Sequence, residues 1–274
     1  MRARVRWPVL AWVVLVGALS ASAESPRVVE PGSAPDLLNE SILFFAGFDR
    51  DSPTADLAAG RADPLRVEGT PRYVRGRFGR AVVLGAGGDG VRLTYASEAQ
   101  LDLRRPGALS FWSKPVAWLD TREPSRGYVK FVTVPARPGS FVVERMGFDR
   151  RKRRGDRLIV GVFDLPRTER LHVQIKGTEQ WSTAEWHLVV VNWDRYGIEV
   201  SLDGRPFEQR AAPEGFQADA FVRGKVHAPF VIGDAGSETS AIDEFTLYAR
   251  PLAPAEVSRL YGTRETKKDA KPAE

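Results

Sequence analysis

Two adjacent carboxylates, Asp243 and Glu244, come nearest in this sequence to an acid–base catalytic pair. A retaining glycoside hydrolase needs two carboxylates about 5 Å apart, one as nucleophile and one as general acid. Residues 242–249 have the composition of a β-strand, and neighbouring strand residues point to opposite faces of a sheet. We therefore predict that Asp243 and Glu244 do not act on one sugar bond and that the chain is not an enzyme.

Other catalytic motifs are missing or stand in the wrong context. The chain has no cysteine, which excludes a thiol nucleophile, a disulfide framework and a lipoprotein anchor, and only three histidines. Residues 85–90 spell Gly-Ala-Gly-Gly-Asp-Gly, which matches the glycine spacing of a dinucleotide site. That site requires a helix next, whereas residues 91–95 alternate as a strand does. We interpret the glycines as a hairpin loop.

The most basic segment is Arg150 to Arg154, which lies between Asp149 and Asp156. Apolar segments on both sides favour a solvated hairpin tip. The alternative is a patch for an anionic glycan or an anionic surface, because clustered guanidinium groups pair well with sulfate, carboxylate and phosphate.

The first 23 residues have the pattern of a secretory signal peptide. Arg2, Arg4 and Arg6 precede an apolar run over residues 9–19, and Ala21-Ser22-Ala23 supplies a cleavage site. Cleavage there removes three arginines and no acid, so the formal net charge falls from +5 to +2. We expect export to the periplasm or the extracellular space, with no further transmembrane segment and no nucleic-acid partner.

The remaining chain divides into three parts. Residues 24–40 are rich in Pro, Ser and Glu and are expected to form a flexible lead-in, and residues 263–274 a disordered tail. Residues 41–262 contain short apolar segments divided by Gly, Pro and Asp, and one helix is expected from Pro254. The expected strands are 41–48, 81–84, 91–95, 108–114, 128–134, 141–148, 158–163, 171–175, 186–193, 197–202, 230–232 and 242–249. This pattern predicts an all-β fold, a two-sheet antiparallel sandwich or jelly roll with one short C-terminal helix.

Short motifs follow one another in an order that is similar to a known family. They are Phe48-Asp49, Gly76-Arg77-Phe78-Gly79-Arg80-Ala81, Ser110-Phe111-Trp112-Ser113-Lys114-Pro115, the Trp186 to Asp194 strand, Asp203-Gly204 and Ile242-Asp243-Glu244. In this order they resemble the laminin G-like type of the concanavalin A-like jelly roll, which is found in exported bacterial proteins. The resemblance implies one domain over residues 41–262.

The same resemblance implies a metal and a function. Members of the family hold calcium with an early Asp, a late Asp and backbone carbonyls, which nominates Asp49 and Asp243. Turn capping is the alternative role for both. The family function is recognition of carbohydrate or of a cell-surface protein, and aromatics at loops or strand ends are the expected contacts: Trp118, Tyr128, Trp181 and Tyr196.

Two further functions remain open at this point. The same fold hosts carbohydrate-active hydrolases and lyases, which need acid and base groups converging in a groove. A structural component of the envelope would instead present a flat apolar patch. Fold alone does not fix function. The family resemblance makes a non-catalytic recognition module the favoured prediction.

Overall fold

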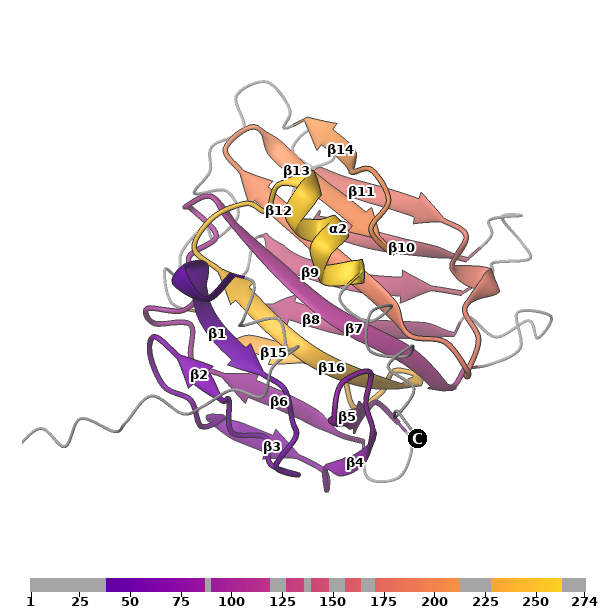
Figure 1. The fold of residues 1–274 in the computed structure, drawn as a ribbon. Helices are drawn as coiled ribbons and strands as arrows, with labels where there is room; N and C mark the ends of the chain where they lie inside the picture. The colour runs from indigo at the N-terminus through magenta and orange to yellow at the C-terminus, as the bar shows by residue number, and fades with distance from the viewer. Residues whose placement is uncertain are drawn as a thin grey trace, which may run out of the picture.

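The chain folds as a sandwich of two antiparallel β-sheets with a short helix lying on the outside of one of them (Figure 1). The computed structural model describes residues 38–86, 90–118, 127–135, 139–147, 156–163, 171–211 and 228–262. The predicted signal peptide, the basic segment Arg150 to Arg154 and the tail 263–274 lie outside the described residues. The all-β, two-sheet prediction is confirmed.

The first sheet, sheet A, contains nine strands within the described ranges. The main path runs β14 (Glu208–Ala211), β13 (Gly197–Leu202), β12 (His187–Asp194), β7 (Gly107–Ala117), β16 (Thr239–Tyr248), β1 (Ile42–Ala46) and β2 (Leu57–Ala58). A hairpin of β4 (Arg72–Arg75) and β5 (Arg80–Leu84) pairs with the first half of β16. Helix α2 (Pro254–Gly262) packs on the outer face of this sheet (Figure 1).

The second sheet, sheet B, contains seven strands within the same ranges. Their order is β11 (Leu171–Lys176), β10 (Arg157–Phe163), β9 (Ser140–Met146), β8 (Tyr128–Val134), β15 (Phe230–Ile232), β6 (Arg92–Tyr95) and β3 (Arg66–Glu68). Strand β6 follows the glycine-rich segment directly, and Gly85 bridges to Val91. The glycines are therefore followed by a strand, as predicted, and not by the helix that a dinucleotide site needs. Beyond the single Gly85–Val91 bridge, β5 and β6 enter different sheets.

The core between the sheets is aromatic. Phe44 and Phe230 meet edge to face with ring centroids 5.2 Å apart, and Phe111 and Phe131 lie 5.3 Å apart. Strand β12 contributes Trp193 to this core, while Leu188 and Val190 on its other face pack beneath α2. The two-sided apolar pattern of residues 186–193 therefore marks a central strand covered on both faces, as the sequence predicts.

One turn and one helix start have the predicted geometry. Asp203 and Gly204 have φ values of 52° and 71°, so the turn that follows β13 has positive φ at both central residues. Helix α2 begins at Pro254, a residue whose fixed φ suits the first helical position.

Strand β16 departs from the expected alternation at its carboxylates. Ile242 and Phe245 both enter the inner core, although an uninterrupted strand would send them to opposite faces. The pairing with β7 slips between Asp243 and Thr246, and Glu244 has a φ of 54°, so the strand holds a β-bulge here. The extra residue turns both Asp243 and Glu244 away from the inner core, which corrects the assumption that they face opposite ways.

Candidate functional site

Trp118 and Trp181 lie against each other. Their ring centroids are 5.8 Å apart, and each ring also contacts another side chain. The guanidinium of Arg145 lies 4.1 Å from the Trp118 ring, and the imidazole of His187 stacks on Trp181 at 4.3 Å. Trp118 Nε1 donates to Ser240 Oγ at 2.9 Å. These contacts hold both indoles in one packed cluster with Arg145 and His187.

Tyr128 lies on β8 of sheet B, where it is half-buried. The ammonium of Lys130 lies 5.5 Å from its ring, and Lys130 also pairs with Asp234 at 3.3 Å. The structure does not bring Tyr128 to Tyr196, because Tyr196 belongs to the β12–β13 hairpin of sheet A.

Tyr196 is the most open of the predicted aromatics, with 65% of its surface exposed. The Asp194 carboxylate fixes the turn that carries it by accepting the backbone N–H groups of Tyr196 at 2.6 Å and Gly197 at 3.0 Å. The Arg195 guanidinium covers one ring face at 4.5 Å and donates to the Tyr196 hydroxyl. An exposed ring in a fixed turn offers a stacking platform at low entropic cost.

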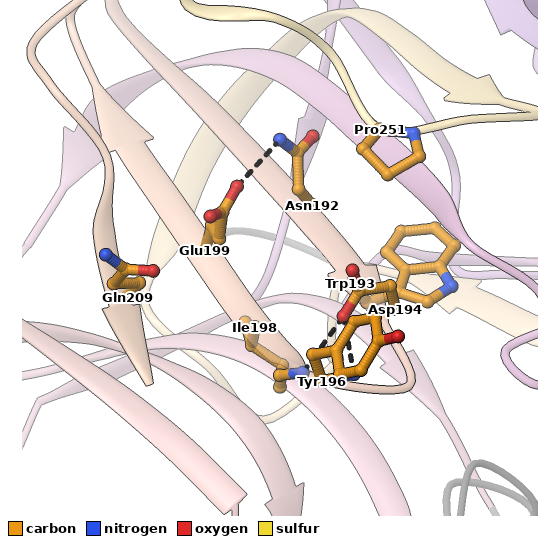
Figure 2. A pocket seen from close by; sticks show the side chains of 9 residues that line it. Asn192, Trp193, Asp194, Tyr196, Ile198, Glu199, Gln209 and Pro251 are labelled. Atoms are coloured by element: carbon orange, nitrogen blue, oxygen red, sulfur yellow. Dashed lines mark hydrogen bonds between the residues drawn. The ribbon is translucent and has the colours of Figure 1, made fainter. Parts of the chain in front are cut away.

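Tyr196 stands at one end of a cavity of about 240 Å³ on the outer side of sheet A (Figure 2). Glu199, Gln209 and Asn192 form a row across its floor, because β13 pairs Glu199 with Gln209 on β14 and with Asn192 on β12. Figure 2 shows the Asn192 amide facing the Glu199 carboxylate, with Nδ2 donating to Oε2 at 3.4 Å. Pro251 lines the same cavity.

Asn192 holds this floor rigidly to the segment before α2. Its Oδ1 accepts the Leu252 N–H and its Nδ2 donates to the Leu252 carbonyl, both at 2.9 Å. An amide that is 2% exposed and bonded twice to one residue cannot turn freely, so it positions the Glu199 carboxylate through their shared hydrogen bond.

A second cavity of about 410 Å³ adjoins the first, and Glu199 lines both. Phe207, Arg205, Pro254 and Ser258 also line this second cavity. We call the two cavities together the outer groove; its named contacts are Tyr196, Glu199, Gln209, Phe207, Arg205 and Ser258. Aromatic rings toward both ends, with a carboxylate, an amide and a hydroxyl between them, suit a long ligand that carries both C–H faces and hydroxyl groups.

Asp49 and Asp243 meet at the loop between β4 and β5, although they stand far apart in the sequence. Asp49 Oδ1 accepts the N–H of Arg80 at 2.7 Å, and Asp243 Oδ2 accepts the N–H of Phe78 at 2.9 Å. A Cβ at Gly79, where φ is +45°, would lie 1.8 Å from Asp49 Oδ1. Glycine is therefore required in this loop so that the carboxylate can approach the backbone.

Both carboxylates titrate above their ordinary range. Burial raises the pKa of Asp49, although the hydrogen bond from Arg80 opposes the shift. Burial and the neighbouring Glu244 charge raise the pKa of Asp243 well above its usual value. Asp243 is fully buried, and its Oδ1 has no hydrogen-bond partner among the described residues. An excess of buried negative charge with an unused oxygen is what a cation would relieve.

Calcium fits this arrangement in part. Two carboxylates converge and one buried oxygen is unused, yet no cluster of three or more Asp, Glu, His or Cys side chains with metal-binding geometry occurs in the described part of the chain. A calcium ion held by Asp49 and Asp243 would therefore need backbone carbonyls and water for its other ligands. Its contribution would be to tie β1, the β4–β5 loop and β16 together.

We predict that millimolar calcium raises the melting temperature of the chain and that Asp243→Asn abolishes the rise. Asn keeps an oxygen to accept the Phe78 N–H but removes the buried charge. A raised folded pKa means that Asp243 destabilises the fold increasingly as pH rises from about 4 through that pKa. In chelator, Asp243→Asn should therefore be at least as stable as the parent chain at pH 7. Melting curves from pH 4 to pH 8, with calcium and with chelator, measure both effects.

Asp243→Ala separates the role of Asp243 as a loop cap from its role as a calcium ligand. It removes the acceptor of the Phe78 N–H as well as the buried charge. We expect it to lose about 1–3 kcal/mol through the unsatisfied Phe78 N–H, with or without calcium. An unchanged melting temperature of the parent chain on adding calcium would leave Asp49 and Asp243 as loop caps only.

The Asp243–Glu244 pair is closed to substrate despite the bulge. Asp243 is fully buried and Glu244 is 2% exposed. A hydrolase acid and nucleophile must reach the glycosidic bond, so these two carboxylates do not provide a glycosidase site.

Known proteins match this chain in fold and not in sequence. No protein-family model matches it, and a search of curated proteins gave no match. Among the described residues, no helix is long and apolar enough to cross a bilayer.

Solved structures share the sandwich. One is described as showing that cell entry of botulinum neurotoxin type C depends on two ganglioside molecules; it aligns with a TM-score of 0.61 and 10% identity over 84% of this chain and 52% of that chain. The binding domain of botulinum neurotoxin DC in complex with rat synaptotagmin II aligns with a TM-score of 0.60 and 12% identity. The alignment covers 82% of this chain and 52% of that chain. The binding domain of Paraclostridial mosquitocidal protein 1 aligns with a TM-score of 0.59 and 13% identity. The alignment covers 81% of this chain and 52% of that chain.

The chain thus spans about half the length of each of these structures. At these identities the likeness shows the fold, a β-sandwich that also occurs in receptor-binding domains. The laminin G-like type, which the short motifs suggest, remains a prediction.

Proposed function

We propose that this chain is an exported, non-catalytic recognition module of the laminin G-like type that binds a carbohydrate chain in the outer groove. The observation that carries the proposal is that two cavities adjoin at Glu199, with the exposed Tyr196 lining one and Phe207 lining the other. A chain of sugar rings has apolar C–H faces for the aromatics and hydroxyl groups for the polar row.

The polar groups of the outer groove suit hydroxyls. Glu199 supplies carboxylate oxygens that accept, and Gln209 can both donate and accept. The Ser258 hydroxyl donates to the Pro254 carbonyl at 3.0 Å, so toward a ligand its oxygen accepts. The floor is fixed before binding, because Asn192 ties Glu199 to Leu252 and Asp194 fixes the Tyr196 turn. A preformed site loses less entropy on binding than a mobile one.

The fold supports a binding role of this kind. Of the sandwiches that share this fold, one is described through the dependence of toxin cell entry on two ganglioside molecules, and another is named as a binding domain in complex with synaptotagmin. Those ligands belong to those proteins, and they show that this architecture serves glycan and protein receptors alike. The polar row of Glu199, Gln209 and Asn192 in the outer groove favours the glycan for this chain.

A glycan array tests the proposal. The chain is expressed with residues 1–23 and purified from the exported fraction, and export would leave Glu24 as the first residue. We expect binding to oligosaccharides of several units and weak or no binding to single sugars, because two cavities must be filled. Binding to no glycan, in calcium or in chelator, would refute the carbohydrate proposal and leave a protein surface as the ligand.

A further inference from the structure

A separate cavity of about 370 Å³ lies under the loop that joins β6 to β7. Ser97, Gln100, Asp102, Arg104 and Arg105 of this loop line it. Trp193 lines both this cavity and the outer groove, so the two sites are neighbours. We call it the loop cavity.

The loop is held in one shape by side-chain hydrogen bonds. Gln100 Nε2 donates to the carbonyls of Ala96 at 2.6 Å and Arg61 at 3.2 Å. Trp193 Nε1 donates to the Arg105 carbonyl at 2.9 Å. The cavity wall is therefore prepared before any ligand arrives.

Two buried oxygens of residues that line this cavity have no hydrogen-bond partner in the described part of the chain. Gln100 is 1% exposed and Ser97 is 2% exposed, and neither Gln100 Oε1 nor Ser97 Oγ makes a hydrogen bond within the described chain. Buried polar atoms are nearly always paired, so such a pair beside a cavity indicates hydrogen-bonding groups that enter from outside the chain. Gln100 Oε1 accepts, and Ser97 Oγ donates or accepts, which matches hydroxyl groups.

The rim of the loop cavity carries one positive charge in excess. Arg104 binds Asp102 through two hydrogen bonds of 2.8 Å, and this contact holds the pKa of Asp102 below its ordinary value. Arg105 Nε lies 3.7 Å from the same carboxylate, and the Arg105 side chain is 83% exposed. One carboxylate thus faces two guanidinium groups, and Arg105 keeps hydrogen-bond donors for an incoming anion.

We propose that the loop cavity binds an acidic monosaccharide unit, a hexuronic acid, with its carboxylate on Arg105 and its hydroxyls on Gln100 Oε1 and Ser97 Oγ. The ligand class rests on the proposed carbohydrate function, whereas the site and its residues are separate from the outer groove. The cavity volume suits one sugar ring, and Leu101 and Pro106 provide apolar wall for the C–H face of that ring.

The test is a ligand-observed saturation-transfer NMR titration of the full chain with D-glucuronate, D-glucose and acetate at equal ionic strength. We expect glucuronate to bind at least about tenfold more tightly than glucose or acetate, because only glucuronate offers both the carboxylate and the hydroxyls. Arg105→Gln should weaken glucuronate binding by about tenfold or more, and Ser97→Ala by several-fold.

Arg66→Gln is the matched control, because Arg66 is another exposed arginine that lies on β3, and it should leave glucuronate binding unchanged. Tyr196→Ala should also leave glucuronate binding unchanged, because Tyr196 belongs to the outer groove. A glycan array that shows no binding in the outer groove therefore leaves the loop-cavity proposal standing. Equal binding of acetate, no detectable glucuronate binding, or full binding by Arg105→Gln would each overturn the proposal.

Discussion

Replacing Arg145 with methionine is expected to lower the free energy of unfolding by about 3–5 kcal/mol. Arg145 is 2% exposed, and its guanidinium binds Asp156 and donates to Glu238 Oε2, the latter at 2.9 Å. Methionine fills much of the volume but leaves two buried carboxylates without their cation. It also removes the contact of 4.1 Å with the Trp118 ring. Guanidinium denaturation of the parent chain and of Arg145→Met measures the difference.

Arg66→Met is the control for this prediction. Arg66 pairs with Glu68 at 3.0 Å, but its side chain is 68% exposed, so the loss should stay below about 1 kcal/mol. Adding Asp156→Asn and Glu238→Gln to Arg145→Met should recover part of the stability, because the two buried charges that Arg145 neutralises are then removed as well. An Arg145→Met variant as stable as Arg66→Met would contradict the role of the buried network.

Tyr196→Ala is expected to weaken binding of the array-selected oligosaccharide by at least about tenfold, about 1.4 kcal/mol. The ring is 65% exposed and makes few contacts beyond Arg195, so its removal should change binding far more than stability. Isothermal titration calorimetry measures the affinity, and thermal melting checks the fold.

Tyr128→Ala is the matched control, since it removes an aromatic ring from sheet B. It should bind the oligosaccharide as the parent chain does. Weaker binding by Tyr128→Ala together with unchanged binding by Tyr196→Ala would place the ligand on the other sheet.

Much of the fold follows from local patterns in the sequence. The two-sided apolar run of residues 186–193 predicts the central strand β12, and the Asp203-Gly204 turn predicts the hairpin that follows β13. Strands β2, β3 and β4 give no such signal. They are short edge strands, and β3 and β4 are largely polar and exposed, so no alternation of buried and exposed residues marks them.

The bulge at Glu244 shows a second limit of local pattern. Its positive φ is unusual for glutamate, and nothing in the sequence Ile-Asp-Glu-Phe announces it. Pairing with β7 on one side, and with β5 and then β1 on the other, imposes the extra residue. The burial of both carboxylates follows from that three-dimensional pairing.

Some residues of the candidate site are predictable from the sequence, and others are brought together only by the fold. Tyr196 is identifiable because it is an aromatic in a turn, and Asp49 and Asp243 because they sit in motifs of the resembled family. Glu199 and Gln209 become neighbours only through the register between β13 and β14. The loop cavity depends on Gln100 and Ser97 being buried in a connecting loop, which their polar side chains do not predict.

The most direct test of the central claim is amide chemical-shift mapping of the chain with its array-selected oligosaccharide. The outer groove predicts the largest shifts at Gly197, Glu199 and Gln209, with the surroundings of Tyr128 on sheet B unaffected. Shifts confined to sheet B, or none at saturating ligand, would contradict recognition in the outer groove.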